Sequence, residues 1–300
     1  MSEPNPANSI SARTDEVFIQ KIEELSKGSI SIMLYPDGSL GDNPTVMELV
    51  MQPKASIHIA RISPATLVKY DCKLHELLDI PFTFQNHEHF WRFNESQVAE
   101  RILQEPYNLN IGVRGLYFSE EGFRHFFSTK KLNSIEDFAG ESIRTAGNSM
   151  MKRIVTAFKG IPVEVSFTDL YSALQTNLVT IAEQPISNYL ANNFNKVAPY
   201  MILDGHELGI AEVVINSNLW DSLSEEQKNI FIEAGKYAAT YCSKVVLESE
   251  NQAKLALRSD GTEFTEIDDI SKWQEQCADV ISESSRENIE VYGEIIRFAD

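Results

Sequence analysis

Residues 122–185 constrain the fold more than any other part of the chain. They place Arg124 at the end of one apolar segment and Arg144 at the start of another, where a strand would meet a loop. In α/β proteins, ligand-binding groups collect at such strand ends. This stretch therefore predicts an α/β protein whose ligand site includes both arginines.

Four short motifs follow one another along the same stretch. They read GFRHF from Gly122, SIEDFAGESIR from Ser134, FTDLYSALQTN from Phe167 and EQP from Glu183. In this order and spacing they resemble the signature of the substrate-binding subunits of TRAP transporters, the DctP-type extracytoplasmic solute receptors. The resemblance extends from about residue 18 to the C-terminus.

The resemblance implies both a fold and a function. We expect an α/β, periplasmic-binding-protein-like fold of two lobes, with a central cleft, two crossing strands and a long lobe-spanning helix. Residues 1–121 and 210–249 would form lobe I, and residues 122–209 and 250–300 would form lobe II. A monomer would bind a small organic acid in the cleft, in the periplasm, and deliver it to the TRAP permease subunits of the membrane. No cofactor or metal is expected.

Individual ligand-binding residues also follow from the resemblance. Arg144 takes the position of the family's main carboxylate clamp, Arg124 that of its second arginine, and Phe167 that of the phenylalanine that covers the ligand. Gln184 stands where the family usually has asparagine, so its amide reaches one methylene further. Arginine suits this role because its planar guanidinium pairs with a carboxylate through two parallel hydrogen bonds.

The first lobe offers weaker candidates. Arg61 and Ser63 follow a predicted strand and are expected to face the cleft. Glu183 and His206 match family positions that we interpret as structural. A C4-dicarboxylate, a sugar acid such as a uronate or sialate, and another small organic acid all remain possible ligands.

One departure from the family pattern predicts local strain. Thr180 and Ile181 stand where the family has aspartate and glycine. If that glycine adopts a positive φ, isoleucine resists the same conformation at a cost of about 1–2 kcal/mol. Either the turn therefore differs from the family's at this point, or this part of the motif has drifted.

Hydrophobic periodicity and turn residues predict the remaining elements. Residues 1–14 are expected to form a loop or a disordered start, and Asp15 to cap a helix over 18–25. The family's first strand and an export signal are not visible: either the given sequence starts after them, or the domain is truncated and has a gap in its first sheet. The alternation of helices and strands predicts parallel sheets. Strands are predicted over 29–35, 56–62, 109–118, 201–203, 211–215 and 265–267, and helices over 45–52, 86–103, 224–257 and 271–298.

Composition excludes several classes of function. A net charge of −18 argues against nucleic acid, whose binding needs a basic surface. No apolar run approaches the ~18 residues of a membrane span. The three cysteines, without a CxxC pair, predict neither a disulfide framework nor a zinc site. His87 and His89 suggest a metal, but we interpret them as loop or helix-start residues because no third ligand is visible nearby.

An enzyme and a sensor are the competing interpretations. The common catalytic templates, such as GxSxG, GxGxxG, the P-loop and HExxH, are absent from the sequence. An α/β enzyme acting on a carboxylate would therefore need a base and a nucleophile that no motif indicates. A receptor that presents its ligand-loaded lobes to a signalling partner is not distinguished from a transport protein by the sequence.

Overall fold

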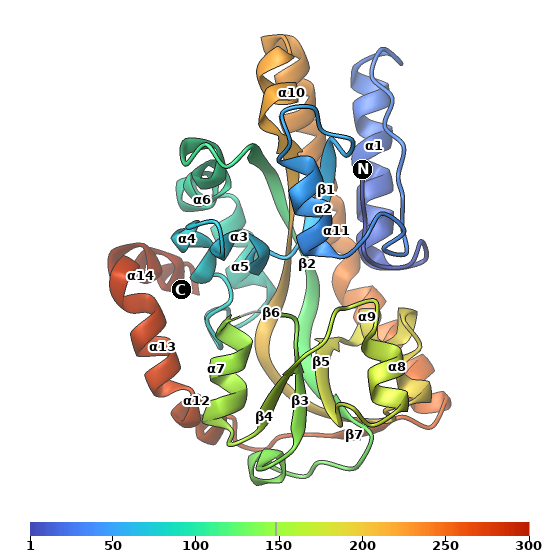
Figure 1. Cartoon of the computed structure of the whole chain (residues 1–300), viewed down its shortest axis with the longest axis vertical. Coiled ribbons are helices and arrows are strands. Elements are labelled where there is room, and N and C mark those ends of the chain that lie inside the picture. Colours follow the sequence, from blue (N-terminus) through green and yellow to red (C-terminus); the bar gives the residue numbers. More distant parts are fainter. Residues whose placement is uncertain (148, 300) are drawn as a thin grey trace.

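Two long antiparallel strands form the centre of the computed structural model, which describes residues 1–147 and 149–299. They are β2 (Val113–Ser128) and β6 (Tyr200–Asn216), and they run through both halves of the molecule (Figure 1). The sheet has the order β1-β6-β2-β5-β3-β4, and β7 pairs with β6. The other strands are β1 (Ile59–Ile62), β3 (Ser142–Thr145), β4 (Ile161–Glu164), β5 (Ile181–Pro185) and β7 (Glu263–Thr265).

The sheet is mixed, whereas strand and helix alternation predicted parallel sheets. β6 pairs antiparallel with β1 and β2, and β2 pairs antiparallel with β5. β3 is parallel to β4 and β5, and β7 is parallel to β6. The expected pair of crossing strands is confirmed, because β2 and β6 belong to both halves. The sequence predicted only the first part of β2 and the two ends of β6.

Helices cover both faces of this sheet (Figure 1). They are α1 (Ile10–Leu25), α2 (Asn43–Val50), α3 (Ala65–Val68), α4 (Lys73–Glu76), α5 (His87–Asn94), α6 (Gln97–Asn108), α7 (Ser149–Ala157), α8 (Leu170–Gln175), α9 (Ile186–Ala191), α10 (Ser217–Ser222), α11 (Glu225–Ser259), α12 (Ser271–Gln276), α13 (Ala278–Ser285) and α14 (Ile289–Ile296). Two predicted helices are divided. The helix predicted over 86–103 is divided into α5 and α6, because Ser96 caps the start of α6. The helix predicted over 271–298 is divided into α12, α13 and α14.

The N-terminal segment pairs with two neighbouring segments, so the alternatives of a disordered start and of a gap in the sheet are wrong, whereas residues 1–9 form an irregular loop, as the other alternative predicted. Ser2 forms β-bridges with both Tyr35 and Ala60, and so lies between the segments that contain these two residues. Of the predicted strand over 29–35, only Tyr35 takes part. Ser9 caps α1 by accepting the Ala12 N–H at 3.1 Å. The predicted cap, Asp15, lies inside α1, where its carboxylate binds Arg61.

The long helix α11 confirms the predicted lobe-spanning helix. Its 35 residues pack on α1 and β2 in one half and on α9 in the other. Within residues 1–147 and 149–299, no helix combines the length and the apolar character that a membrane crossing requires.

A capping box starts α11 and gives a first prediction. The Ser224 hydroxyl accepts the Gln227 N–H at 3.2 Å, and the Gln227 side chain accepts the Ser224 N–H at 2.9 Å. Ser224→Ala should lower the free energy of unfolding by about 1 kcal/mol, because it removes the cap from one helix N–H. Urea unfolding would measure this. Ser243→Ala in the middle of the helix is the matched control, expected within about 0.5 kcal/mol of the native chain.

Ile181 is not strained, which corrects the expectation for the Thr180–Ile181 position. Ile181 is fully buried in the extended strand β5. In the connection between α8 and β5, the residue with a positive φ is Asn177, at 55°. Asparagine tolerates the left-handed conformation that isoleucine resists. Asn177→Ala should therefore destabilise the fold by about 1 kcal/mol, while Asn177→Gly should not. Equal effects of both substitutions in urea unfolding would contradict this explanation.

Candidate functional site

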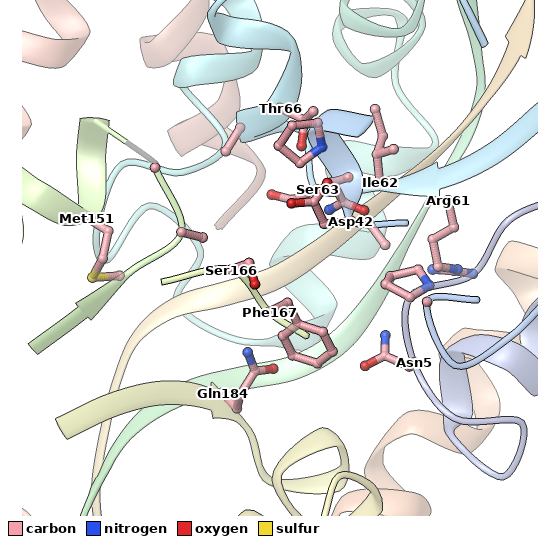
Figure 2. Close-up of a pocket in the computed structure, with 18 of the residues that line it drawn as sticks. Asn5, Asp42, Arg61, Ile62, Ser63, Thr66, Met151, Ser166, Phe167 and Gln184 are labelled. Atoms are coloured by element: carbon pink, nitrogen blue, oxygen red, sulfur yellow. The ribbon is translucent and has the colours of Figure 1, made fainter. Parts of the chain in front are cut away.

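A cavity of about 680 Å³ lies between the two halves of the molecule. Such a volume is typical of a site for a small molecule. In Figure 2, Asp42, Ser63 and Thr66 lie on one side of it, and Phe167 and Gln184 lie on the other. The cavity is lined by all of the residues predicted as ligand contacts, namely Arg61, Arg124, Arg144, Phe167 and Gln184, and also by Ser63.

Arg144, on β3, is a buried cation with few partners. It is 3% exposed, its Nε donates to the Val165 carbonyl at 3.0 Å, and its Nη1 lies 4.0 Å from Oε1 of Glu183. Among the described residues, its two terminal nitrogens make no hydrogen bond. Burial lowers the pKa of Arg144 to about 10; Glu183 partly offsets this, and the neighbouring Arg124 adds to it. An anion in the cavity would relieve this unfavourable environment.

Arg124, on β2, is already neutralised. It forms an ion pair with Glu183. Burial opposes its charge, but the carboxylates of Glu183 and Glu207 outweigh burial and raise the pKa of Arg124. The pairing with Glu183 follows from the register of β2 and β5, in which Glu183 lies opposite Phe126.

Arg61, on β1, lines the cavity but directs its donors to protein groups. Its Nη2 and Nε lie 2.7 and 3.0 Å from Oδ1 of Asp15, and its Nε lies 3.0 Å from Oε2 of Glu3. Its Nη1 donates to the Ser119 hydroxyl at 2.7 Å. The guanidinium therefore joins the N-terminal segment, α1 and β2 to the cavity wall.

Phe167 and Gln184 offer an apolar surface and an open amide. The Phe167 ring packs edge to face on Phe194, with ring centroids 6.1 Å apart. Gln184 is 4% exposed on β5, and its side chain makes no hydrogen bond to any residue that the structure describes. Both side chains lie beside the cavity in Figure 2, so both are available to a ligand.

Sequence reasoning missed a polar network that joins the two halves beside the cavity. Oε1 of Glu121 accepts from the Ser11 hydroxyl at 2.6 Å and from the Asn5 amide at 3.3 Å. Oε2 of Glu121 accepts from the Asn188 amide at 3.0 Å. These residues come from the chain start, α1, β2 and α9, so no local motif indicates them. The missed residues of the cavity wall also include Asp42, Thr66, Glu164, Ser166 and Glu207.

The histidines considered from the sequence lie outside the cavity wall. His87 and His89 face different partners: Nδ1 of His87 lies 2.5 Å from Oε2 of Glu120, whereas Nε2 of His89 lies 2.9 Å from the Ile295 carbonyl. His206 stacks on Phe126 and pairs with Asp204 at 2.5 Å. His206 thus has the surroundings of a structural residue.

Comparison with known proteins identifies similar sequences and structures. The family model of the bacterial extracellular solute-binding proteins, family 7 (DctP), matches residues 1–288. The C4-dicarboxylate-binding periplasmic protein DctP of Rhodobacter capsulatus is 23% identical over 273 residues, which cover 89% of this chain and 80% of that protein.

Solved structures of TRAP periplasmic solute-binding proteins have the same fold. One from Pseudomonas putida F1, with bound D-glucuronate, has a TM-score of 0.93 and 22% identity, and covers 98% of this chain and 95% of its own. Another from Polaromonas sp. JS666, bound to D-erythronate, has a TM-score of 0.92 and 25% identity. The match covers 98% of this chain and 96% of that protein.

Proposed function

Because the chain belongs to family 7 of the bacterial extracellular solute-binding proteins, we propose that it carries a small organic acid with one carboxylate and several hydroxyl groups. It is a periplasmic solute-binding protein of the TRAP type and not an enzyme. The ligand is held in the cavity between the two halves and delivered to TRAP permease subunits in the membrane.

The charge balance of the cavity supports a single carboxylate. Arg61 is paired with Asp15 and Glu3, and Arg124 is paired closely with Glu183, so Arg144, whose Nη1 lies 4.0 Å from the shared Glu183, is the least compensated of the buried arginines. Lys69 also lines the cavity, but it is exposed and therefore screened by solvent.

Other wall residues favour hydroxyl groups on the rest of the ligand. Ser63, Thr66, Ser166, Gln184 and Asn5 are neutral hydrogen-bonding residues. The acids of the wall, Asp42, Glu164 and Glu207 among them, would repel a second carboxylate. A hydroxyl group can donate to these acids and accept from the amides.

Each predicted contact receives a role in this proposal. Arg144 binds the carboxylate in the two-pronged manner of a guanidinium. Gln184 binds a neighbouring oxygen, and Phe167 covers the apolar face of the ligand. Arg124 holds Glu183 in place and contacts the ligand from the side. Arg61 changes from an expected ligand contact to a brace of the wall, because its donors bind Asp15, Glu3 and Ser119.

Closure of two lobes around the ligand completes the proposal. We keep residues 1–121 and 210–249 as lobe I, and residues 122–209 and 250–300 as lobe II. The boundary falls where β2 and β6 approach closely: Gly122 has a φ of 95°, and a Cβ on Gly209 would lie 3.0 Å from the Gly122 carbonyl oxygen. The closed form is the one that the permease recognises.

A thermal-shift and calorimetry panel tests the ligand class. D-glucuronate, D-galacturonate and D-erythronate represent acids with one carboxylate, and succinate represents the C4-dicarboxylates. We expect at least one hydroxy acid to raise Tm and to bind with a micromolar or lower Kd, whereas succinate binds more weakly. Tighter binding of succinate would contradict the single-carboxylate proposal, and chemical conversion of a bound acid would favour an enzyme.

A further inference from the structure

A second group of chemically capable side chains lies away from the cavity. Cys72, His75 and Glu105 each offer one ligand atom, and these atoms lie within 4.8 Å of one another. Cys72 and His75 are three residues apart at the start of α4, and Glu105 comes from α6. Cys72 and His75 are fully buried, and Glu105 is 13% exposed. None of the three lines the cavity of the proposed function.

The surroundings of His75 fix the orientation of its ring. Nδ1 lies 2.8 Å from Oε2 of Glu105, and Nε2 lies 2.9 Å from Oε2 of Glu212. The Glu105 carboxylate is held in turn by the Leu74 N–H, 3.1 Å from each of its oxygens. At metal centres, a histidine that binds the ion through one ring nitrogen is often oriented by a carboxylate at the other. Here Glu212 lies at Nε2, and Cys72 and Glu105 are grouped with Nδ1.

Glu212 provides a separate observation of unsatisfied negative charge. It is fully buried on β6, and neither of its carboxylate oxygens has a hydrogen-bond partner among the described residues, although Oε2 lies 2.9 Å from Nε2 of His75. A buried carboxylate without hydrogen-bond partners is costly, so Glu212 favours the donor that Nε2 of His75 offers.

We propose that the Cys72 Sγ, the His75 Nδ1 and the Glu105 carboxylate bind one divalent transition-metal ion, with Glu212 as the positioning residue for the histidine. Sulfur, nitrogen and oxygen ligands in this combination suit zinc. The thiol releases its proton when the ion binds, and Nδ1 of His75 binds the ion unprotonated while Nε2 keeps its proton facing Glu212. A water molecule takes the fourth position on the partly exposed side of Glu105.

The geometry requires small adjustments in both directions: Nδ1 of His75 and Oε2 of Glu105, 2.8 Å apart, must separate, and the widest pair of ligand atoms must close. Ligand atoms of a tetrahedral zinc site lie roughly 3.5 Å apart, given bonds of about 2.0–2.3 Å. The present limit of 4.8 Å exceeds this by about 1 Å, which rotation of the Cys72 and Glu105 side chains can supply. The bound ion would join α4 to α6.

Cobalt(II) is the probe for this site, because a thiolate bound to it gives a charge-transfer absorption. The native chain is first stripped with EDTA under reducing conditions and then titrated with Co²⁺. We expect one equivalent to bind with the thiolate-to-cobalt absorption. Cys72→Ser should abolish that absorption, whereas Cys242→Ser, the matched control at another buried free cysteine, should keep it.

Further variants separate a metal site from a structural ion group. Glu212→Gln should keep the absorption but weaken Co²⁺ binding by about 10–100-fold, because the histidine loses its orienting carboxylate. If Cys72→Ser fails to fold, Glu105→Gln replaces it, since an amide oxygen still accepts the Leu74 N–H; it should weaken binding by at least about tenfold. No absorption in the native chain, or an equal absorption in Cys72→Ser, would overturn the proposal. The cobalt absorption does not depend on binding of an organic acid, so a negative result here would leave the proposed function untouched.

Discussion

Arg144→Ala should weaken binding of the tightest acid of the panel by at least about tenfold, with little change in Tm. One charge-assisted hydrogen bond contributes about 1.5–3 kcal/mol, and a tenfold change in Kd corresponds to about 1.4 kcal/mol. Stability should be spared because the fold disfavours the charge of Arg144: burial lowers its pKa to about 10. Isothermal titration calorimetry and thermal unfolding of the same samples would measure both quantities.

Two further variants make this result specific. Arg144→Lys keeps the positive charge but loses the planar pair of donors, so we expect an affinity between those of the native chain and Arg144→Ala. Arg153→Ala removes an arginine that pairs with Glu283 away from the cavity, and it should leave Kd unchanged. If Arg144→Ala binds the acid as tightly as the native chain does, Arg144 is not the carboxylate clamp.

Arg61→Met should destabilise the fold by about 3–5 kcal/mol, the usual cost of removing one partner from a buried ion pair. The guanidinium is 2% exposed and lies between the fully buried carboxylates of Glu3 and Asp15. Methionine fills similar space but leaves both acids without their cation. Urea unfolding measured at pH 8 would report this loss.

The effect should depend on pH in a defined direction. Burial and the neighbouring Asp15 already raise the pKa of Glu3 well above its usual range. Without Arg61 the folded state would hold the Glu3 proton more strongly still, whereas a glutamate of the unfolded chain ionises near pH 4. The stability of the variant should therefore fall as pH rises, and the loss should be smaller at pH 5 than at pH 8.

Arg153→Met is the control for this second prediction, because its ion pair with Glu283 is largely solvated. Removing such a surface pair changes stability by about 0–1 kcal/mol. A loss for Arg61→Met no larger than that of Arg153→Met would mean that the buried cluster is not a significant source of stability.

Local signals in the sequence predicted several elements accurately. The helix predicted over 224–257 matches α11, and the capping box of Ser224 and Gln227 lies at its start. The apolar runs on either side of residue 206 indicated two pieces of what proved to be one strand, β6. These features succeed because a cap or a strand pattern depends on residues a few positions apart.

Other elements could not be predicted from local patterns. Asp15 looked like a helix cap, but its partner Arg61 lies 46 residues away. Ile181 looked strained, but the strand pairing of β5 places it in an extended, buried position. Glu121 reaches Asn5 and Asn188 from distant parts of the chain, so its place at the cavity emerges only when the halves are assembled.

The sequence by itself determined the family, the two crossing strands, the long helix and the arginines of the cavity, because motifs and periodicity are written in neighbouring residues. Only the tertiary structure decided which arginine remains available to a ligand. The charge state of a guanidinium depends on the carboxylates that folding brings beside it: Glu183 beside Arg124, and Glu3 and Asp15 beside Arg61. Arg144, which lines the cavity, has the weakest of these pairings, because its Nη1 lies 4.0 Å from a Glu183 that already binds Arg124.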